Sequence, residues 1–173
     1  VINADDQTWI LNPVPDFSYG LNISLGYKGL DFTMFWQGVQ GVEVYNNQKF
    51  QTDFWSLTDA GSNKGSRLLD AWTTDNTSSL IPALTTNNTG DEGRRSTYFV
   101  ENGSYLKLRD LSLGYSLPTK FLEKANITKT RFYVSGHNLL TLKSKSLTCK
   151  DPENPNWAYP LATSVTFGVQ VGF

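Results

Sequence analysis

The feature that most constrains this chain is an uninterrupted two-residue alternation that carries no charge. From Phe17 to Tyr27, aromatic and aliphatic side chains occupy every second position, and Ser, Gly and Asn occupy the positions between them. A half-buried β-strand produces this pattern, because successive side chains point to opposite faces of a sheet. Lys28-Gly29 then makes a tight turn, and the alternation resumes from Leu30 to Trp36. Residues 16–38 are therefore predicted to form a β-hairpin, with strands at 16–27 and 30–38.

Three further segments alternate in the same way. Residues 104–117 form a third predicted strand, in which the apolar parity switches at Arg109-Asp110. We interpret this switch as a β-bulge or as the rim of a membrane. Residues 129–140 and 163–173 are the fourth and fifth predicted strands, and the last of them contains no charge. The predicted fold class is all-β, with five antiparallel strands.

The polar parity of these strands favours a membrane barrel over a soluble sheet. It consists mainly of Gly, Ser, Thr, Asn and Gln, whereas a soluble sandwich would carry charges on its solvent parity. Charged residues make up only 18% of the chain, against a typical value of about 25%. Strands of about 10 residues match a tilted crossing of the hydrocarbon layer. The pattern predicts part of a large transmembrane β-barrel with a lipid-facing exterior and a wet lumen.

The connections between the predicted strands alternate in length. Lys28-Gly29 and residues 118–128 are short, whereas 39–102 and 141–162 are long. Outer-membrane barrels have short periplasmic turns and long extracellular loops, so both long segments are predicted to be extracellular. A loop as long as 39–102 needs a core of its own, which its aromatic residues are expected to build. Short helical pieces are expected near 53–57 and 66–72.

The barrel interpretation assigns roles to individual side chains. The membrane-facing set is expected to comprise Tyr19, Leu21, Ile23, Leu25, Phe32, Met34, Leu113, Tyr115, Phe132, Val134, Phe167, Val169 and Val171. The end of the chain resembles the C-terminal strand that barrel-assembly machinery recognises, through Val165, Phe167, Val169, Val171 and Phe173. Aromatic loop residues either contact a ligand or partner or anchor the loops; these are Trp55, Trp72, Trp157 and Tyr159.

Composition excludes several other classes of function. A net charge of −1 argues against nucleic-acid binding, and the chain has no run of about 18 apolar residues that would make a transmembrane helix. A single His and a single Cys leave no multi-ligand metal site, no disulfide framework and no recognisable catalytic triad. We therefore expect no enzyme, no cofactor and no metal. His137 is expected to be a hydrogen-bonded residue of the lumen wall, and Cys149 a free thiol in a polar loop.

Several segments, in order along the chain, resemble one known family. They are Pro15–Gly20 with Phe35–Gly38, Glu101–Pro118, Arg131–Leu142, Asp151–Asn154 with Tyr159-Pro160, and Thr166–Phe173. Their sequences resemble those of SusC/RagA-type TonB-dependent outer-membrane transporters, over nearly the whole chain outside residues 39–100. The chain then corresponds to the C-terminal part of such a transporter.

The resemblance implies a function and a set of partners. A family member has a barrel of about 22 strands and an N-terminal plug with a TonB box. It lies in the outer membrane of a Gram-negative bacterium and imports oligosaccharides or peptides with energy delivered through TonB. A SusD-type surface lipoprotein closes over it as a lid. The remaining partners are the rest of the barrel, the plug, the TonB complex and the lipid bilayer.

Two alternatives stay open at this point. A passive outer-membrane porin would share the barrel but lack a plug and TonB box in its upstream sequence. A soluble glycan-binding β-sandwich would place charges on the solvent parity of each strand. The uncharged strand faces count against the sandwich, and the upstream sequence would discriminate transporter from porin.

Overall fold

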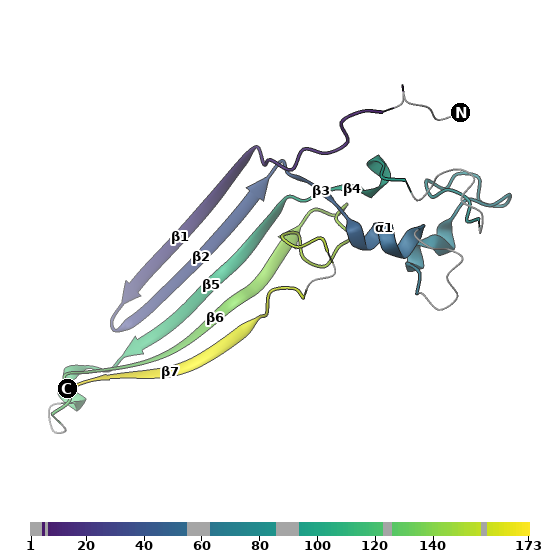
Figure 1. The fold of residues 1–173 in the computed structure, drawn as a ribbon. Coiled ribbons are helices and arrows are strands. Elements are labelled where there is room, and N and C mark those ends of the chain that lie inside the picture. The colour runs from purple at the N-terminus through teal and green to yellow at the C-terminus, as the bar shows by residue number, and fades with distance from the viewer. Residues whose placement is uncertain (1–4, 6, 55–62, 86–93, 123–125, 157–158) are drawn as a thin grey trace. The chain divides into compact units, whose positions relative to one another are not determined.

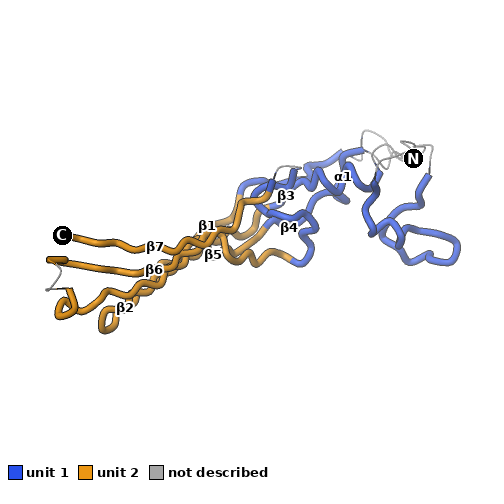
Figure 2. The backbone as a smooth tube through the Cα atoms, turned by 90° about the horizontal axis from the view of Figure 1, so that it is seen from below, with its two compact units in different colours: residues 1–14, 43–103, 145–159 blue, residues 15–42, 104–144, 160–173 orange. Residues whose placement is uncertain are grey.

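The computed structural model describes residues 5, 7–54, 63–85, 94–122, 126–156 and 159–173 (Figure 1). They divide into two compact units, which Figure 2 distinguishes by colour. The sheet unit comprises residues 15–42, 104–144 and 160–173. The loop unit comprises residues 1–14, 43–103 and 145–159. Among the described residues, no helix has the length and apolarity needed to cross a membrane.

The sheet unit is a single five-stranded antiparallel sheet. Its strands are β1 (Phe17–Tyr27), β2 (Leu30–Gln40), β5 (Tyr105–Ser116), β6 (Lys129–Lys143) and β7 (Ser164–Gly172), and they pair in the order β1-β2-β5-β6-β7 (Figure 1). Each strand therefore pairs with its nearest neighbour along the sequence within the unit. The short 3₁₀ helix η4 (Thr119–Phe121) lies in the β5–β6 connection. The antiparallel fold class predicted from the alternation is confirmed.

Pairing places apolar residues opposite apolar residues along the whole sheet. Leu25 pairs with Phe32, Phe32 with Leu113, Leu113 with Val134, and Val134 with Phe167. A shift of one residue on any strand would move its apolar side chains to the opposite face, so the alternation fixes the register.

A β-bulge explains the parity switch on the third predicted strand. Leu108 and Asp110 of β5 pair with consecutive residues of β2, Trp36 and Phe35, which leaves Arg109 as the extra residue. The neighbouring strand β6 is irregular at the same level, where Asn138 has a φ of 52°. Because of the bulge, Leu108 returns to the apolar face. The bulge interpretation is therefore correct.

The β1–β2 turn has the backbone that a two-residue hairpin requires. Lys28 has a φ of 45° and Gly29 a φ of 87°, as in the turns whose twist matches paired strands. A Cβ at Gly29 would lie 2.8 Å from the carbonyl oxygen of Ser116, so this position needs glycine for space as well as for conformation.

The loop unit has short elements that the sequence indicated only in part. β3 (Glu43–Tyr45) pairs with β4 (Val100–Asn102), and the unit also holds α1 (Asn47–Asp53) and the 3₁₀ helices η2 (Ser66–Asp70) and η3 (Thr97–Phe99). Of the helical piece expected near 53–57, residues 55–57 lie outside the described residues. The helix α1 ends at Asp53 and follows an N-cap, where the Asn46 side chain accepts a hydrogen bond from Lys49 N at 2.9 Å. The piece expected at 66–72 is η2.

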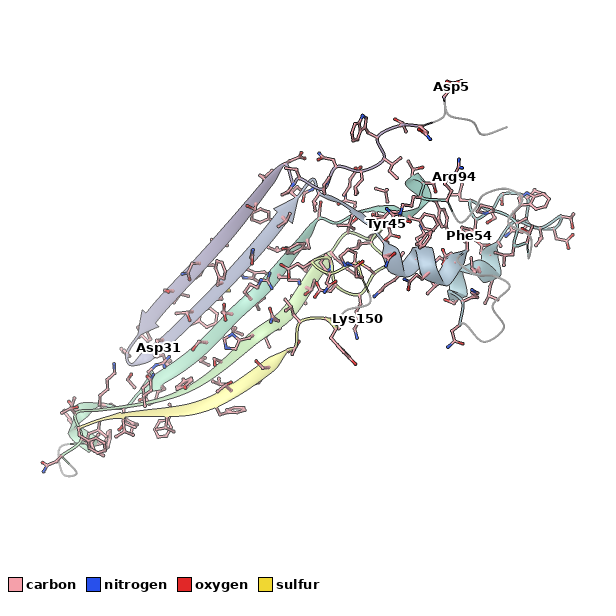
Figure 3. All side chains as sticks on the ribbon, in the orientation of Figure 1. Asp5, Asp31, Tyr45, Phe54, Arg94 and Lys150 are labelled. Carbon is pink, nitrogen blue, oxygen red and sulfur yellow. The ribbon has the colours of Figure 1, made fainter. Side chains whose placement is uncertain are left out.

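An aromatic core holds the loop unit together. Phe54, Leu68 and Phe99 are buried, and four partly buried apolar residues pack around them: Tyr45, Phe50, Ile81 and Tyr98. The Phe99 side chain is fully buried, with its ring centroid 5.0 Å from that of Tyr98 and 5.2 Å from that of Phe50. Figure 3 labels Tyr45 and Phe54 of this core. The expectation that loop 39–102 builds its own core is confirmed.

Candidate functional site

One face of the sheet carries the side chains that the sequence assigned to lipid. The cross-strand register places all of this set on a single face, together with Leu30, Trp36 and Leu111. Most of these side chains are exposed in the chain, as Leu25 at 62% and Phe167 at 80% show. Val165 and the apolar residues of β7 that follow it at every second position share this face. A continuous exposed apolar surface of this kind is suited to contact with a membrane or a protein.

The opposite face is polar and largely uncharged. A row of hydroxyl side chains crosses all five strands, because each member is the register partner of the next. The members of this hydroxyl row are Ser24, Thr33, Ser112, Ser135 and Thr166. Hydroxyls both donate and accept hydrogen bonds, so this row can bind polar groups of either kind and does not require a molecule of a particular charge.

Beside the hydroxyl row, an ion pair reaches across three strands. Asp31 of β2, labelled in Figure 3, accepts a hydrogen bond from Arg131 Nε of β6 at 2.9 Å, and Arg131 Nη2 binds its other carboxylate oxygen. The guanidinium passes over β5 at Gly114, where a Cβ would lie only 2.6 Å from Arg131 Cζ. Gly114 therefore provides the space that lets the two charged side chains meet.

His137 lies on the polar face and has a partner. Its Nδ1 pairs with Asp110 Oδ1, and both side chains are about half exposed. Ser164 is the register partner of His137, but no hydrogen bond joins its hydroxyl to the imidazole in the described part of the chain. His137 and Ser164 thus do not make the nucleophile–base contact of a hydrolase.

The β5 bulge adds a second polar group next to this pair. Arg109 Nε donates to Gln37 Oε1 at 2.8 Å, and Arg109 Nη1 donates to Asn138 Oδ1 at 3.3 Å. The bulge therefore re-aims a cation onto the polar face, which is what bulges commonly do near functional surfaces.

Two buried carboxylates organise the loop unit. Asp53 is fully buried and accepts hydrogen bonds from Tyr98 Oη at 2.8 Å and from Arg67 Nη1 at 3.2 Å. Glu101 is 6% exposed and accepts hydrogen bonds at 2.8 Å from Asn46 Nδ2, from Thr148 N and from Thr148 Oγ1. Buried charges require such partners, so both carboxylates fix the segments around them.

Burial also shifts the pKa values of Lys49 and Tyr98, which lie between the two carboxylates. Desolvation lowers the pKa of the Lys49 ammonium, and the neighbouring carboxylates of Glu101 and Asp53 oppose that shift. Desolvation and the hydrogen bond to Asp53 raise the pKa of Tyr98 well above its usual value. The phenol is thus held protonated as a donor.

The sequence did not point to the residues of these buried contacts. Asn46, Asp53 and Glu101 are ordinary polar residues in an aperiodic segment, and Thr148 lies 47 positions from the Glu101 that it binds. The one local signal was Asn46, which stands where an N-cap precedes a helix.

Part of the loop unit exposes apolar side chains instead of burying them. Leu69 is 93% exposed, Leu80 94% and Trp72 41%, and we call these three residues the apolar tip. Trp72 N donates to Ile81 O at 2.9 Å, which holds Trp72 beside the segment that carries Leu80. Large apolar side chains exposed in this way are candidates for an interaction surface.

Of the other three aromatic candidates, one lies among the described residues. Tyr159 is 97% exposed. Trp55 and Trp157 lie outside the described residues. The sequence candidates Trp72 and Tyr159 thus both present their rings at the surface of the described loop unit.

The described residues contain no group of three or more His, Cys, Asp or Glu side chains arranged to hold a metal ion. Cys149 is fully buried and forms no disulfide among the described residues, and its thiol donates to the Asp151 carbonyl at 3.4 Å. Burial keeps this thiol away from solvent, so it is a packing residue of the loop unit.

Comparison with known proteins identifies the architecture. No family model matches the chain. It is 36% identical over 140 residues to TonB-dependent receptor P3 of Formosa agariphila, covering 81% of this chain and 13% of that receptor. It is 29% identical over 185 residues to TonB-dependent receptor SusC of Bacteroides thetaiotaomicron, covering 99% of this chain and 16% of SusC. The RagAB peptide importer in its open-open state superposes with a TM-score of 0.79 at 28% identity, over 100% of this chain and 19% of that one. The chain corresponds to a segment of a SusC/RagA-type TonB-dependent receptor.

This correspondence places the chain in the outer membrane of a Gram-negative bacterium. The five-stranded sheet matches a segment of the RagA barrel, and this likeness over the full chain argues against a soluble glycan-binding sandwich. The chain spans 13% to 19% of the length of these SusC/RagA relatives.

Proposed function

We propose that this chain is part of an outer-membrane importer that takes up oligosaccharides or peptides and is energised through TonB. The observation that carries the proposal is the full-chain likeness to the RagAB peptide importer and to SusC, joined to a sheet with one apolar and one polar face. The chain catalyses no bond chemistry in this proposal.

The two faces of the sheet have different roles in the importer. The apolar face contacts lipid, and the polar face lines the lumen, because a transmembrane barrel alternates its side chains in this way. The outer edges of β1 and β7 pair with other barrel strands, since an unpaired edge in a membrane would leave backbone hydrogen-bonding groups unsatisfied.

The connections set the orientation of the sheet. The β1–β2 turn and residues 118–128 face the periplasm, and loops 39–102 and 141–162 are extracellular, as short and long connections are in such barrels. The alternating end of the chain acts as the assembly signal in its C-terminal strand.

The loop unit is the proposed docking surface for a SusD-type lipoprotein lid. It has its own core, so it can present a stable face, and its apolar tip supplies the large apolar side chains that anchor interfaces. A stable contact of this kind should cover more than about 1,000 Å² in total. Trp72 and Tyr159 are proposed contact residues within it, along with Trp55 and Trp157 on sequence grounds.

Removal of energy coupling from the full-length receptor tests active import. We would express the receptor with its lipoprotein in the native host and follow uptake of a labelled peptide mixture and a labelled oligosaccharide mixture. Deletion of the TonB box should abolish uptake of the mixture that is transported. Uptake that continues at the original rate would identify a passive porin instead.

Substitution of the apolar tip tests docking separately. Leu69→Ser, Trp72→Ala and Leu80→Ser, combined in the full-length receptor, should lower recovery of the lipoprotein in a detergent pull-down. Lys150→Gln, in the second loop of the same unit, is the matched control. Unchanged recovery with the triple variant would assign docking to loops outside this chain.

A further inference from the structure

A continuous line of polar contacts runs through the loop unit from the second long loop to the apolar tip. Its members, in order of contact, are Thr148, Glu101, Lys49, Tyr98, Asp53 and Arg67, which we call the polar relay. These residues come from several segments, so their proximity arises only in the folded unit.

At one end, Glu101 joins three segments. Its carboxylate binds both the amide and the hydroxyl of Thr148, and it also binds the side chain of Asn46. Asn46 in turn caps α1. Residues 145–150 are thereby attached to the start of α1 through this carboxylate and through a direct hydrogen bond of 2.8 Å from Asn46 Nδ2 to Thr148 Oγ1.

In the middle, Lys49 and Tyr98 connect the two carboxylates. Lys49 Nζ lies 3.6 Å from Glu101 Oε1, donates to the Tyr98 carbonyl at 2.6 Å, and sits 3.8 Å from the centroid of the Tyr98 ring. The Tyr98 hydroxyl donates to Asp53 at 2.8 Å. A shift of Glu101 would therefore alter the groups that hold Asp53.

At the other end, Asp53 fixes the helix that begins the tip. Arg67 contacts both carboxylate oxygens of Asp53, at 3.2 Å and 3.3 Å, and belongs to η2. Leu68, the next residue, is buried in the aromatic core, and Leu69 is the first exposed residue of the tip. The direction in which Leu69 points thus depends on where Arg67 and Leu68 are held.

We propose that the polar relay makes residues 145–150 a positioning element for the apolar tip. Local opening of one long loop is then coupled to local opening of the other. Removing one partner from a buried charged network leaves the others unpaired, which is costly at every member. The significance for lipoprotein docking rests on the proposed function, but the coupling itself is a property of the receptor alone.

Hydrogen exchange of the full-length receptor, without lipoprotein, tests the coupling. Glu101→Gln replaces an acceptor oxygen by an amide that faces donors from Lys49, Asn46 and Thr148. Exchange in residues 145–150 and in residues 66–85 should both rise, by about tenfold or more. Arg67→Gln should raise exchange in the same two segments, because coupling between two sites is reciprocal.

Glu43→Gln is the matched control. Glu43 lies on β3, which pairs with the β4 strand that carries Glu101, but it is exposed. Among the hydrogen bonds of the described residues, its side chain accepts only the one from Asn12 N. This variant should leave exchange in both segments unchanged. Thr148→Val is a milder test that removes only the hydroxyl, and it should raise exchange in residues 66–85 by a smaller factor.

Two results would overturn the proposal. One is a rise confined to residues 145–150 in Glu101→Gln, with 66–85 unaffected. The other is an equal rise in Glu43→Gln. A separate pull-down with the lipoprotein distinguishes the proposals: coupled exchange with unaltered docking would retain the relay and reject the docking role of the tip.

Discussion

The sheet unit and the loop unit achieve order in opposite ways. The sheet is regular apart from the bulge at Arg109, yet its large apolar side chains are mostly exposed, as Phe167 at 80% illustrates. The loop unit has little regular structure, yet it buries Phe54, Leu68 and Phe99 and two paired carboxylates. Backbone pairing can thus exist without a core, and a core can exist without repeating structure. The apolar face of the sheet has to be covered by its surroundings, whereas the loop unit covers its apolar side chains with its own residues.

The largest expected effect is a loss of stability in the loop unit when its core is disrupted. Phe99→Ala removes the fully buried ring on which the aromatic core packs and should destabilise the unit by about 3–5 kcal/mol. Hydrogen exchange of the full-length receptor should show faster exchange across residues 43–54 and 94–103, with β6 and β7 unaltered. Phe121→Ala, at a 75% exposed position, is the control. Equal loss of protection in the sheet would contradict the division into independent units.

A charge on the apolar face tests the dependence of the sheet on its surroundings. Val169→Arg should cost about 2–4 kcal/mol if the face meets the middle of a bilayer. Heat modifiability of the full-length receptor on SDS gels should show unfolding at a lower temperature. Thr166→Arg, in the same strand but in the hydroxyl row, should have a much smaller effect. Equal effects at the two positions would contradict the assignment of faces.

The glycine beneath the Asp31–Arg131 pair provides a finer test of the sheet. Gly114→Val would place side-chain atoms where the guanidinium crosses β5, and overpacking of this kind costs about 1–3 kcal/mol. Gly26→Ala is the matched control, because it lies in the same row and its Cβ would come no closer than 4.0 Å to another group. The same heat-modifiability assay should separate the two variants. Equal stability would mean that the ion pair relocates at no cost.

The smallest effect concerns pH and the loop unit. The pKa of Tyr98 is raised in the folded state, so its contribution to stability is complete below the ordinary tyrosine value of about 10 and is lost as the pH rises through the higher folded value. Absorbance titration of the receptor should lose one late-titrating tyrosine in Tyr98→Phe, whereas Tyr45, whose pKa is also raised by burial, should still titrate late. A Tyr133→Phe variant, in β6, is the control and should retain it.

The sequence predicted the sheet well because a period of two specifies both element and face. The alternation from Phe17 to Tyr27 and the parity switch at Arg109 have one interpretation each once the strands pair. The set that was predicted to face lipid shares one face for the same reason. What the alternation could not supply was contacts between strands that skip a neighbour, such as Asp31 with Arg131 across Gly114.

The loop unit was predictable only in outline. Its length and aromatic content indicated a separate core, but no period distinguishes Leu68, which is 7% exposed, from Leu69, which is 93% exposed. A 3₁₀ helix of 5 residues is too short for a repeating pattern to show which side is buried. The contact of Glu101 with Thr148 depends on two loops meeting, and nothing local to either residue signals it.

The hydroxyl row on the polar face has a consequence for movement across it. Each Ser or Thr hydroxyl can rotate to donate or to accept, so a passing molecule can exchange one hydrogen bond for the next without leaving a charge unpaired. Charged side chains flank this row on neighbouring rows but do not interrupt it. The sheet therefore offers a polar molecule a series of neighbouring hydrogen-bonding groups at one level of the sheet, none of which carries a charge.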